Sequence, residues 1–194
     1  MAVIEEKRTT KETDIDLSLD LYGKGIYANQ TGLPFFDHML DLVAKHALFD
    51  MTVSCKGDIQ VDSHHTVEDV GIVLGGAFKK ALGDARGIKR YASLMLPMDE
   101  TLASVALDIS GRPYLKYDVP VKGKMESGMD AQVFEEFFRA FAMSAGLTLH
   151  ISVLYGENTH HMLEACFKGF ARCLRYALEK DPRETGIPSS KGIL

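Results

Sequence analysis

The feature that most restricts how this chain can fold is an ordered pattern that occurs twice within its 194 residues. Each copy has a phenylalanine-rich helical segment, then an alternating strand, and then a helix that opens with His-His-x-x-Glu. The first copy covers residues 35–47, 51–55 and 64–82, and the second covers residues 134–145, 147–154 and 160–177. This repeat predicts an internally duplicated α+β fold, in which two mixed β-sheets flank one central helical layer.

Other segments have strand patterns of their own. Residues 13–21 alternate between apolar and polar side chains, which predicts a half-buried strand. Residues 102–109 and 114–119 also predict strands, and residues 59–61 predict a short one. The expected divisions are a first β/α half-repeat at 1–94, a second at 95–180, and a Pro/Gly/Ser-rich tail at 181–194.

Composition narrows the class of protein. A content of 46% hydrophobic and 25% charged residues is ordinary for a globular domain. The formal net charge of −5 gives no reason to expect nucleic acid or an anionic membrane as a partner. The three cysteines form no C-x-x-C pair, and their odd number argues against a secreted disulfide framework. No apolar run is long enough to span a membrane. We therefore expect a cytoplasmic protein with buried free thiols.

The two His-His-x-x-Glu motifs contain four of the seven histidines. On a helix, the first His and the Glu of each motif lie four residues apart on one face, so both can reach one ion. The second His is rotated by about 100° and serves a different ion. One such motif alone has little weight, but two at matching positions of a duplication predict metal sites.

We call the second His of each motif, His65 or His161, the odd histidine. We expect each of two ions to take a His and a Glu from one helix and the odd histidine from the other half. The two groups are His64 with Glu68 and His161, and His160 with Glu164 and His65. Each half should add a ligand from its preceding helix, His38 in the first and Glu136 in the second. Mixed imidazole and carboxylate ligands suit Mn²⁺, Fe²⁺, Co²⁺ or Zn²⁺. Asp62 and Asp69 are expected either to accept ring N–H groups or to cap the helix.

Ordered motifs along the whole chain resemble one family, the imidazoleglycerol-phosphate dehydratases of histidine biosynthesis. The matching stretches in the first half are Arg8-x-Thr-x-Glu12-Thr13, Phe35-Phe36-Asp37-His38-Met39-Leu40, Asp62-x-His64-His65-Thr66-x-Glu68-Asp69 and Gly87-Ile88-x-Arg90. Those in the second half are Gly111-Arg112-Pro113-Tyr114-Leu115, Thr148-Leu149-His150, Gly156-x-Asn158-x-His160-His161-x-x-Glu164, Phe167-Lys168 and Ile187-Pro188-Ser189-Ser190-Lys191-Gly192.

The resemblance implies a hydro-lyase that converts D-erythro-imidazoleglycerol phosphate to imidazole-acetol phosphate. It implies two manganese ions per active site, which would hold the substrate as an imidazolate that expels hydroxyl through a diazafulvene-like intermediate. It also implies that each half resembles domain 2 of ribosomal protein S5. Trimers would assemble into a 24-subunit shell, a homo-oligomer with active sites at subunit interfaces.

The resemblance also implies roles for individual residues. The carboxylates expected in catalysis are Glu12, which also contacts substrate, Glu68 and Glu164, with the acid and base roles left open. The residues expected to bind the substrate phosphate are Arg90, Arg112, Lys168, Ser189 and Lys191. His46 is expected in the substrate pocket because it follows His38 on the same segment. The chain departs from many family members by having Glu136 in place of His and Leu42 in place of Gln.

Two other functions use parts of the same residue set. A dinuclear hydrolase of a phosphorylated small molecule could use these ligands to activate water. A non-catalytic metal-storage protein would use the ligands but would leave Glu12 and the cationic residues without a role. A hydrolase would release inorganic phosphate instead of a dehydration product. A storage protein would bind no phosphate ester.

Overall fold

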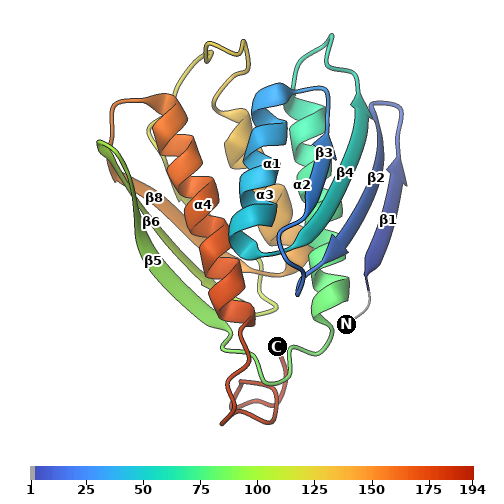
Figure 1. Cartoon of the computed structure of the whole chain (residues 1–194), viewed down its shortest axis with the longest axis vertical. Helices are drawn as coiled ribbons and strands as arrows, with labels where there is room; N and C mark the ends of the chain where they lie inside the picture. Colours follow the sequence, from blue (N-terminus) through green and yellow to red (C-terminus); the bar gives the residue numbers. More distant parts are fainter. Residues whose placement is uncertain (1–2) are drawn as a thin grey trace.

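The computed structural model describes residues 3–194, which form two four-stranded sheets on either side of a layer of four helices (Figure 1). The first sheet has the order β1-β2-β4-β3, with β1 Ile4–Thr9, β2 Thr13–Asp20, β4 Asp50–Gly57 and β3 Tyr27–Gln30. The second has the order β5-β6-β8-β7, with β5 Tyr91–Met98, β6 Thr101–Asp108, β8 Thr148–Tyr155 and β7 Tyr114–Asp118. The helices are α1 Pro34–Ala47, α2 His64–Leu82, α3 Val133–Ala145 and α4 Thr159–Leu178.

The two halves have the same topology, which confirms the predicted α+β fold with its duplicated mixed sheets. In each sheet the three strands that come first in the order are antiparallel, and the last strand pairs in parallel: β3 with β4, and β7 with β8. The equivalence extends to the helix ends. Leu48 after α1 and Gly146 after α3 both adopt left-handed backbone, with φ of 59° and 73°. Left-handed residues at this position are a common way to end a helix.

Residues 59–61 are an exception, because they form a turn rather than the predicted strand. The amide of Val61 donates to the carbonyl of Asp58 at 2.8 Å, and the side chain of Val61 is 65% exposed. The apolar residues in this segment have no neighbouring strand to pair with, so local alternation was misleading there. The expected boundary between residues 94 and 95 falls within β5.

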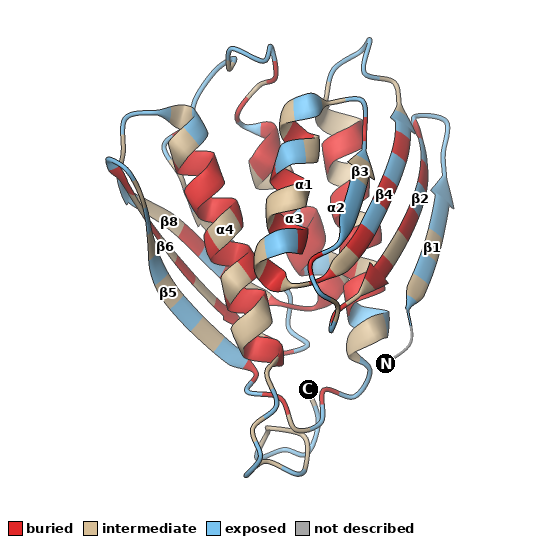
Figure 2. Cartoon of the chain, viewed as in Figure 1, coloured by how far each residue is buried: buried red, intermediate tan, exposed pale blue. Residues whose placement is uncertain are grey.

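Helices from different halves pack against each other: α1 against α4, and α2 against α3. All four helices contain buried residues, drawn red in Figure 2, and those of α1, α2, α3 and α4 belong to one core. Aromatic rings join the layer, with centroids 4.7 Å apart for Phe138 and Phe167 and 5.0 Å apart for Phe141 and Phe170. Burying each such ring stabilises the fold by roughly 1.5–3 kcal/mol.

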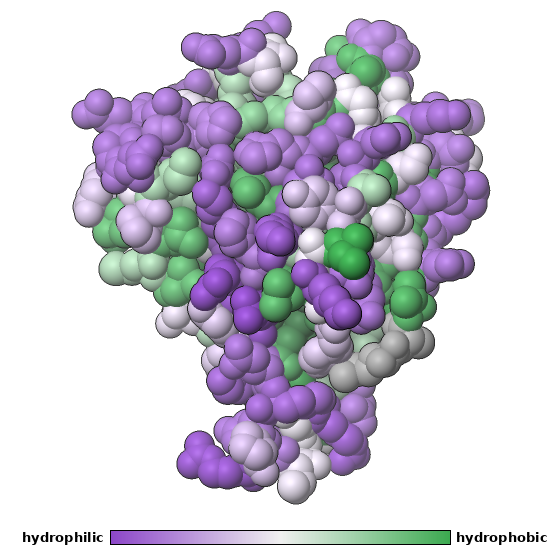
Figure 3. Space-filling model, viewed as in Figure 1, coloured by the Kyte–Doolittle hydropathy of each residue, from purple (hydrophilic) through white to green (hydrophobic). Residues whose placement is uncertain are grey.

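All four helices begin at the same end of the molecule, at the top of Figure 1. The His-His-x-x-Glu motifs lie in the first turns of α2 and α4, and His38 and Glu136 lie near the starts of α1 and α3. Hydrophilic side chains predominate on this end in the face that Figure 3 shows. The parallel arrangement of helices therefore gathers every predicted metal ligand at one end of the layer.

The three cysteines are free and buried, as predicted. Burial raises the pKa of the Cys166 and Cys173 thiols to about 12, so both remain protonated at neutral pH. Within residues 3–194, no helix is both long and apolar enough to cross a bilayer.

Two glycines let α2 and α3 approach closely. A Cβ atom on Gly75 would lie 2.6 Å from the carbonyl oxygen of Phe141, and one on Gly71 would lie 2.8 Å from that of Phe137. Gly76, the next residue on the same helix, has nothing within 4 Å of where its Cβ would be. Gly75 and Gly76 therefore form a matched pair that differs in the space around each residue.

We expect Gly75→Ala to lower the thermal midpoint of unfolding. Overpacking against backbone costs about 1–3 kcal/mol, which exceeds the gain of up to ~1 kcal/mol in helix propensity. Gly76→Ala keeps the propensity gain without the clash, so its midpoint should equal or exceed that of the wild type. Calorimetry of the three proteins tests this, and a Gly75→Ala protein as stable as Gly76→Ala would contradict it.

Candidate metal centre

Three side chains from both halves converge where α1 and α4 begin. Glu164 Oε2 lies 2.9 Å from His160 Nε2 and 3.4 Å from His38 Nε2. Among residues 3–194, these three form the only group of at least three His, Cys, Asp or Glu residues whose ligand atoms all lie within 4.8 Å of one another. The ring of Phe35 packs edge-on to His160, with centroids 5.2 Å apart. Two imidazole nitrogens and one carboxylate oxygen are a fitting donor set for a divalent transition metal.

Lys168 supports the charge of this group. Its ammonium lies 2.5 Å from Glu164 Oε1, one helical turn further along α4. Burial alone would raise the pKa of Glu164, but hydrogen bonds from Lys168 and His160 outweigh burial and hold that pKa at about 2. The carboxyl is therefore ionised at neutral pH, the form that a metal ligand or a general base requires.

The equivalent residues of α2 and α3 form a looser arrangement. His64 Nε2 and Glu68 Oε2 are 3.5 Å apart, and both side chains are nearly half exposed. His64 and Glu136 line one pocket, together with Lys124 from the segment between β7 and α3. Glu136 contacts Arg139 at 3.6 Å on its own helix. The second candidate group thus has one imidazole and two carboxylates, where the first has two imidazoles and one carboxylate.

The odd histidines of the two motifs face acidic residues instead. His65 Nδ1 lies 3.1 Å from Asp58 Oδ2, and its Nε2 lies 3.8 Å from Glu12 Oε1. The hydrogen bond to Asp58 raises the pKa of His65. His161 Nδ1 lies 2.7 Å from Glu100 Oε2, and the resulting hydrogen bond raises the pKa of His161. Of the neighbouring acids only Glu12 was a candidate from sequence, since Asp58 and Glu100 lie outside the repeated motifs.

Within one chain, the first candidate group takes one of its three ligands, His38, from the other half. The sequence paired each odd His with the motif of the other half and named His38 as the ligand that the first half adds, without assigning it to either ion. In the structure His38 joins His160 and Glu164 because α1 packs against α4. The odd histidines, His65 and His161, are not part of this group in the single chain.

The candidate acid–base residue Glu12 lies in the turn between β1 and β2, which is tied to α2 through Asp69. The guanidinium of Arg8 donates twice to Asp69 Oδ1, at 3.0 and 3.2 Å, and the hydroxyl of Thr13 donates to Asp69 Oδ2 at 2.5 Å. Asp69 thus neither accepts a ring N–H nor caps the helix, which corrects both expectations for it. Asp62 lies one residue before the N-cap of α2, Ser63, and its Oδ1 accepts the amide of His64 at 2.8 Å.

Most of the predicted phosphate-binding residues gather far from the helix starts. Arg90, Arg112, Ser189 and Lys191 line one pocket at the tail. Arg90 is 7% exposed and is already engaged, since it donates to both oxygens of Asp108 and to the carbonyl of Pro188. Arg112 has a 70% exposed side chain and lies 3.8 Å from Asp108. Arg112 and Lys191 are thus the more accessible cations, while Arg90 holds the tail in place.

Lys168, the fifth predicted phosphate ligand, lies in the α1–α4 group rather than at the tail. His46 lies near the C-terminal end of α1, and burial followed by the charge of Lys168 lowers its pKa. His46 is therefore neutral at physiological pH. In a single chain, the tail pocket and the helix starts form two separate clusters of predicted site residues.

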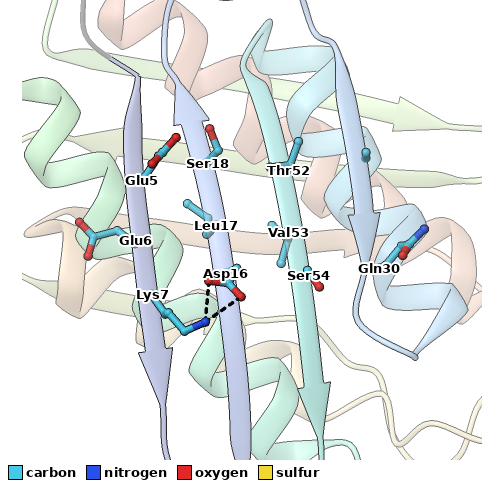
Figure 4. Close-up of a pocket in the computed structure, with 11 residues that line it drawn as sticks. Glu5, Glu6, Lys7, Asp16, Leu17, Ser18, Gln30, Thr52, Val53 and Ser54 are labelled. Atoms are coloured by element: carbon cyan, nitrogen blue, oxygen red, sulfur yellow. Dashed lines mark hydrogen bonds and ion pairs between the residues drawn. The ribbon is translucent and has the colours of Figure 1, made fainter.

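The outer face of the first sheet offers a contrast to these clusters. Figure 4 shows an open groove there, across which side chains from all four strands point outward. Lys7 and Asp16 form an ion pair at 3.2 Å, with both side chains at least 60% exposed. Exposed pairs of this kind are screened by water and contribute little to stability. This pair is a useful reference for the buried contact at Asp69.

The salt bridge to Glu164 should make the stability of the metal-free protein depend on pH. Because the pKa of Glu164 falls from 4.5 to about 2, its contribution is complete above pH 4.5 and is lost as the pH falls toward 2. We expect Lys168→Met to lower the thermal midpoint at pH 6, and this difference should shrink below pH 4.5. Lys79→Met, on the exposed side of α2, is the control. A Lys168→Met difference that is constant with pH would contradict this account.

Removing the buried carboxylate at Asp69 should cost more stability than removing an exposed one. Asp69→Ala leaves Arg8 and Thr13 without their acceptor, at a cost of about 1–3 kcal/mol, or about 2–4 °C in thermal midpoint for each kcal/mol. Asp16→Ala, which breaks the exposed pair with Lys7, should shift the midpoint by a few degrees at most. Equal shifts in the two variants would show that Asp69 does not anchor the turn.

Comparisons with known proteins agree on one family. A family model described as imidazoleglycerol-phosphate dehydratase matches residues 31–174. The imidazoleglycerol-phosphate dehydratase of Caldanaerobacter subterraneus subsp. tengcongensis is 57% identical over 194 residues, covering 100% of both chains. That of Clostridium botulinum (strain Kyoto / Type A2) is 56% identical over 187 residues, covering 96% of this chain and 95% of the relative.

Solved structures give the same result. The crystal structure of imidazoleglycerol-phosphate dehydratase from Staphylococcus aureus subsp. aureus is similar with a TM-score of 0.84 at 37% identity, covering 93% of this chain and 100% of that one. The enzyme from Pyrococcus furiosus has a TM-score of 0.82 at 37% identity, covering 97% and 100%. The matched region includes all four helix starts that carry the histidines and their carboxylates. The chain belongs to the imidazoleglycerol-phosphate dehydratase family.

Proposed function

We propose that this hydro-lyase removes water from D-erythro-imidazoleglycerol phosphate to give imidazole-acetol phosphate, using two divalent metal ions per active site, of which Mn²⁺ is the expected identity. The observation that carries the proposal is the convergence of His38, His160 and Glu164 in a chain of this family. Their nitrogen and oxygen donors suit a metal that must interact with an imidazole-containing substrate.

The proposed ligands form two related groups. His38, His160 and Glu164 hold one ion, and His64, Glu68 and Glu136 hold the other. His65 and His161 complete the shells from a neighbouring subunit, because a single chain does not bring them into the first group. We therefore propose that the active sites lie at subunit interfaces. It agrees with the trimers and 24-subunit shell expected of the family, in a cytoplasmic enzyme.

The side chains have separate tasks in the reaction. When bound, the ions would supply positive charge at the ring nitrogens of the substrate, which would favour the deprotonated ring and let it expel hydroxide from the carbon beside it. The resulting diazafulvene-like intermediate would make the C–H of the next carbon acidic. Glu12, on an exposed turn, is the candidate to move that proton, so that a proton and hydroxide leave as water and the enol that forms becomes the ketone. Arg112, Lys191 and Ser189 bind the phosphate at the interface, helped by Lys168 and by Arg90, while neutral His46 lines the substrate pocket.

A product assay combined with metal removal tests this proposal. Chelation should abolish formation of the ketone product, and added Mn²⁺ should restore it. His160→Ala should lower turnover by about 10²-fold or more, because it removes one metal ligand. His150→Ala is the matched control, since His150 is an exposed histidine on β8 outside the group. Release of inorganic phosphate without ketone would instead identify a hydrolase.

A further inference from the structure

The duplication repeats a Glu-Thr pair that accompanies each odd histidine. Glu12-Thr13 lies where the β1–β2 hairpin enters β2, and Glu100-Thr101 lies where the β5–β6 hairpin enters β6. Thr13 and Thr101 are both buried, at 3% and 1% exposure, and every second residue after them points into the core. Glu12 and Glu100 therefore hold equivalent positions in the two halves.

The two equivalent carboxylates have very different surroundings. Glu100 Oε1 accepts the backbone amides of Asn158 at 2.9 Å and Glu157 at 3.2 Å, and Oε2 faces His161 Nδ1 at 2.7 Å. The carboxylate of Glu12 has no hydrogen bond among residues 3–194, and its nearest charged neighbour is His65 Nε2 at 3.8 Å. Its side chain is 53% exposed. Glu100 is held in place, whereas Glu12 is available to another molecule.

In the first half a different acid faces the odd histidine. Asp58, which follows β4, places both carboxylate oxygens 3.1 Å from His65 Nδ1. Each odd histidine thus has a carboxylate at Nδ1, while its Nε2 has no hydrogen bond among the described residues and lies 3.8 Å from a carboxylate oxygen, of Glu12 for His65 and of Asp99 for His161. Because a neutral imidazole carries one proton, a carboxylate at Nδ1 fixes that proton there and leaves the lone pair on Nε2.

We propose that Glu100 is a positioning residue for His161: it fixes the ring orientation and the Nδ1–H tautomer, so that Nε2 can ligate a divalent metal ion of a neighbouring subunit. Asp58 performs the same task for His65, which leaves Glu12 free for the substrate. The proposal rests on the proposed function, because it takes His161 as a metal ligand. The hydrogen bonds of Glu100 to residues 157 and 158 also join the β5–β6 turn to the start of α4. Asn158 in turn accepts the amides of His160 and His161 with its side chain.

Glu100→Gln separates positioning from simple support of the fold. The amide is nearly the same size as the carboxylate, and its oxygen can keep the two backbone hydrogen bonds. The NH₂ group would then face His161 Nδ1 and donate to it, which moves the ring proton to Nε2 and blocks the metal. We expect a thermal midpoint close to that of the wild type and Mn²⁺ affinity lowered about 10–100-fold, measured by equilibrium dialysis with electron paramagnetic resonance of unbound Mn²⁺.

Glu12→Gln is the matched control, because it makes the same chemical change at the equivalent position. It should keep Mn²⁺ affinity while losing turnover. Asp58→Asn should lower Mn²⁺ affinity as Glu100→Gln does. Wild-type affinity in Glu100→Gln, or an equal loss of affinity in Glu12→Gln, would overturn the proposal.

A measurement on the metal-free protein tests the positioning role of Glu100 independently of the proposed function. Nitrogen-15 NMR of the metal-free protein, recorded at alkaline pH where His161 is neutral, reports which ring nitrogen of His161 carries the proton, with the His161→Asn spectrum identifying the signal. The wild type should show the Nδ1–H form, and Glu100→Gln should show the Nε2–H form. If the tautomer changes in this way but wild-type protein forms no ketone product, the proposed function fails and the positioning role remains. If the tautomer is the same in both proteins, the positioning role fails.

Discussion

The packing of helices from one half against helices from the other is the constraint on which the rest of the structure depends. Gly71 and Gly75 let α2 approach the backbone of α3, while phenylalanine rings fill the space between the helices of the layer. Because α1 packs against α4, the first-half residue His38 meets the second-half residues His160 and Glu164. The candidate metal group is therefore a product of the interface between the halves, and neither half contains it alone.

Each half also ties its hairpin turn to the helix that carries its histidine motif, but by different contacts. In the first half Asp69 of α2 binds Arg8 and Thr13 on either side of the turn. The position one turn after the odd histidine of the second half is Ala165, which cannot make such contacts. There Glu100 of the turn binds the backbone before α4. In both halves one carboxylate joins the hairpin turn to the helix. It belongs to the helix in the first half and to the turn in the second.

Neighbouring charges and hydrogen bonds set the protonation states of the carboxylates and imidazoles at the helix starts. Glu164 stays ionised despite its burial because Lys168 and His160 donate to it, and each odd histidine is paired with a carboxylate at Nδ1. Acidic residues and imidazoles thus lie close together at the helix starts, an environment in which a divalent cation would be favoured. Glu136 makes the second candidate group richer in carboxylate than the first, so the two halves are similar in fold but different in the charge they would present to an ion.

Local sequence patterns were sufficient for much of the architecture. Strand β2, the long helices and the placement of both motifs at helix starts follow from the spacing of apolar side chains, which reports how each element is buried. The same pattern failed at residues 59–61, where two apolar side chains in a turn resembled a strand. Asp58 and Glu100 were not predicted because a single acidic residue in a turn has no spacing that distinguishes it from an ordinary surface residue.

The sequence by itself thus determined the duplication, the fold class, the family resemblance and the residue types that could bind a metal. Only the tertiary structure decided which of those residues meet. It joined His38 to the motif of the opposite half, assigned Asp69 to the hairpin and gave Glu100 and Asp58 to the odd histidines. The physical reason is that periodicity records which face of an element is buried but carries no information on which element covers it. That choice depends on helix packing over separations of about a hundred residues in the chain.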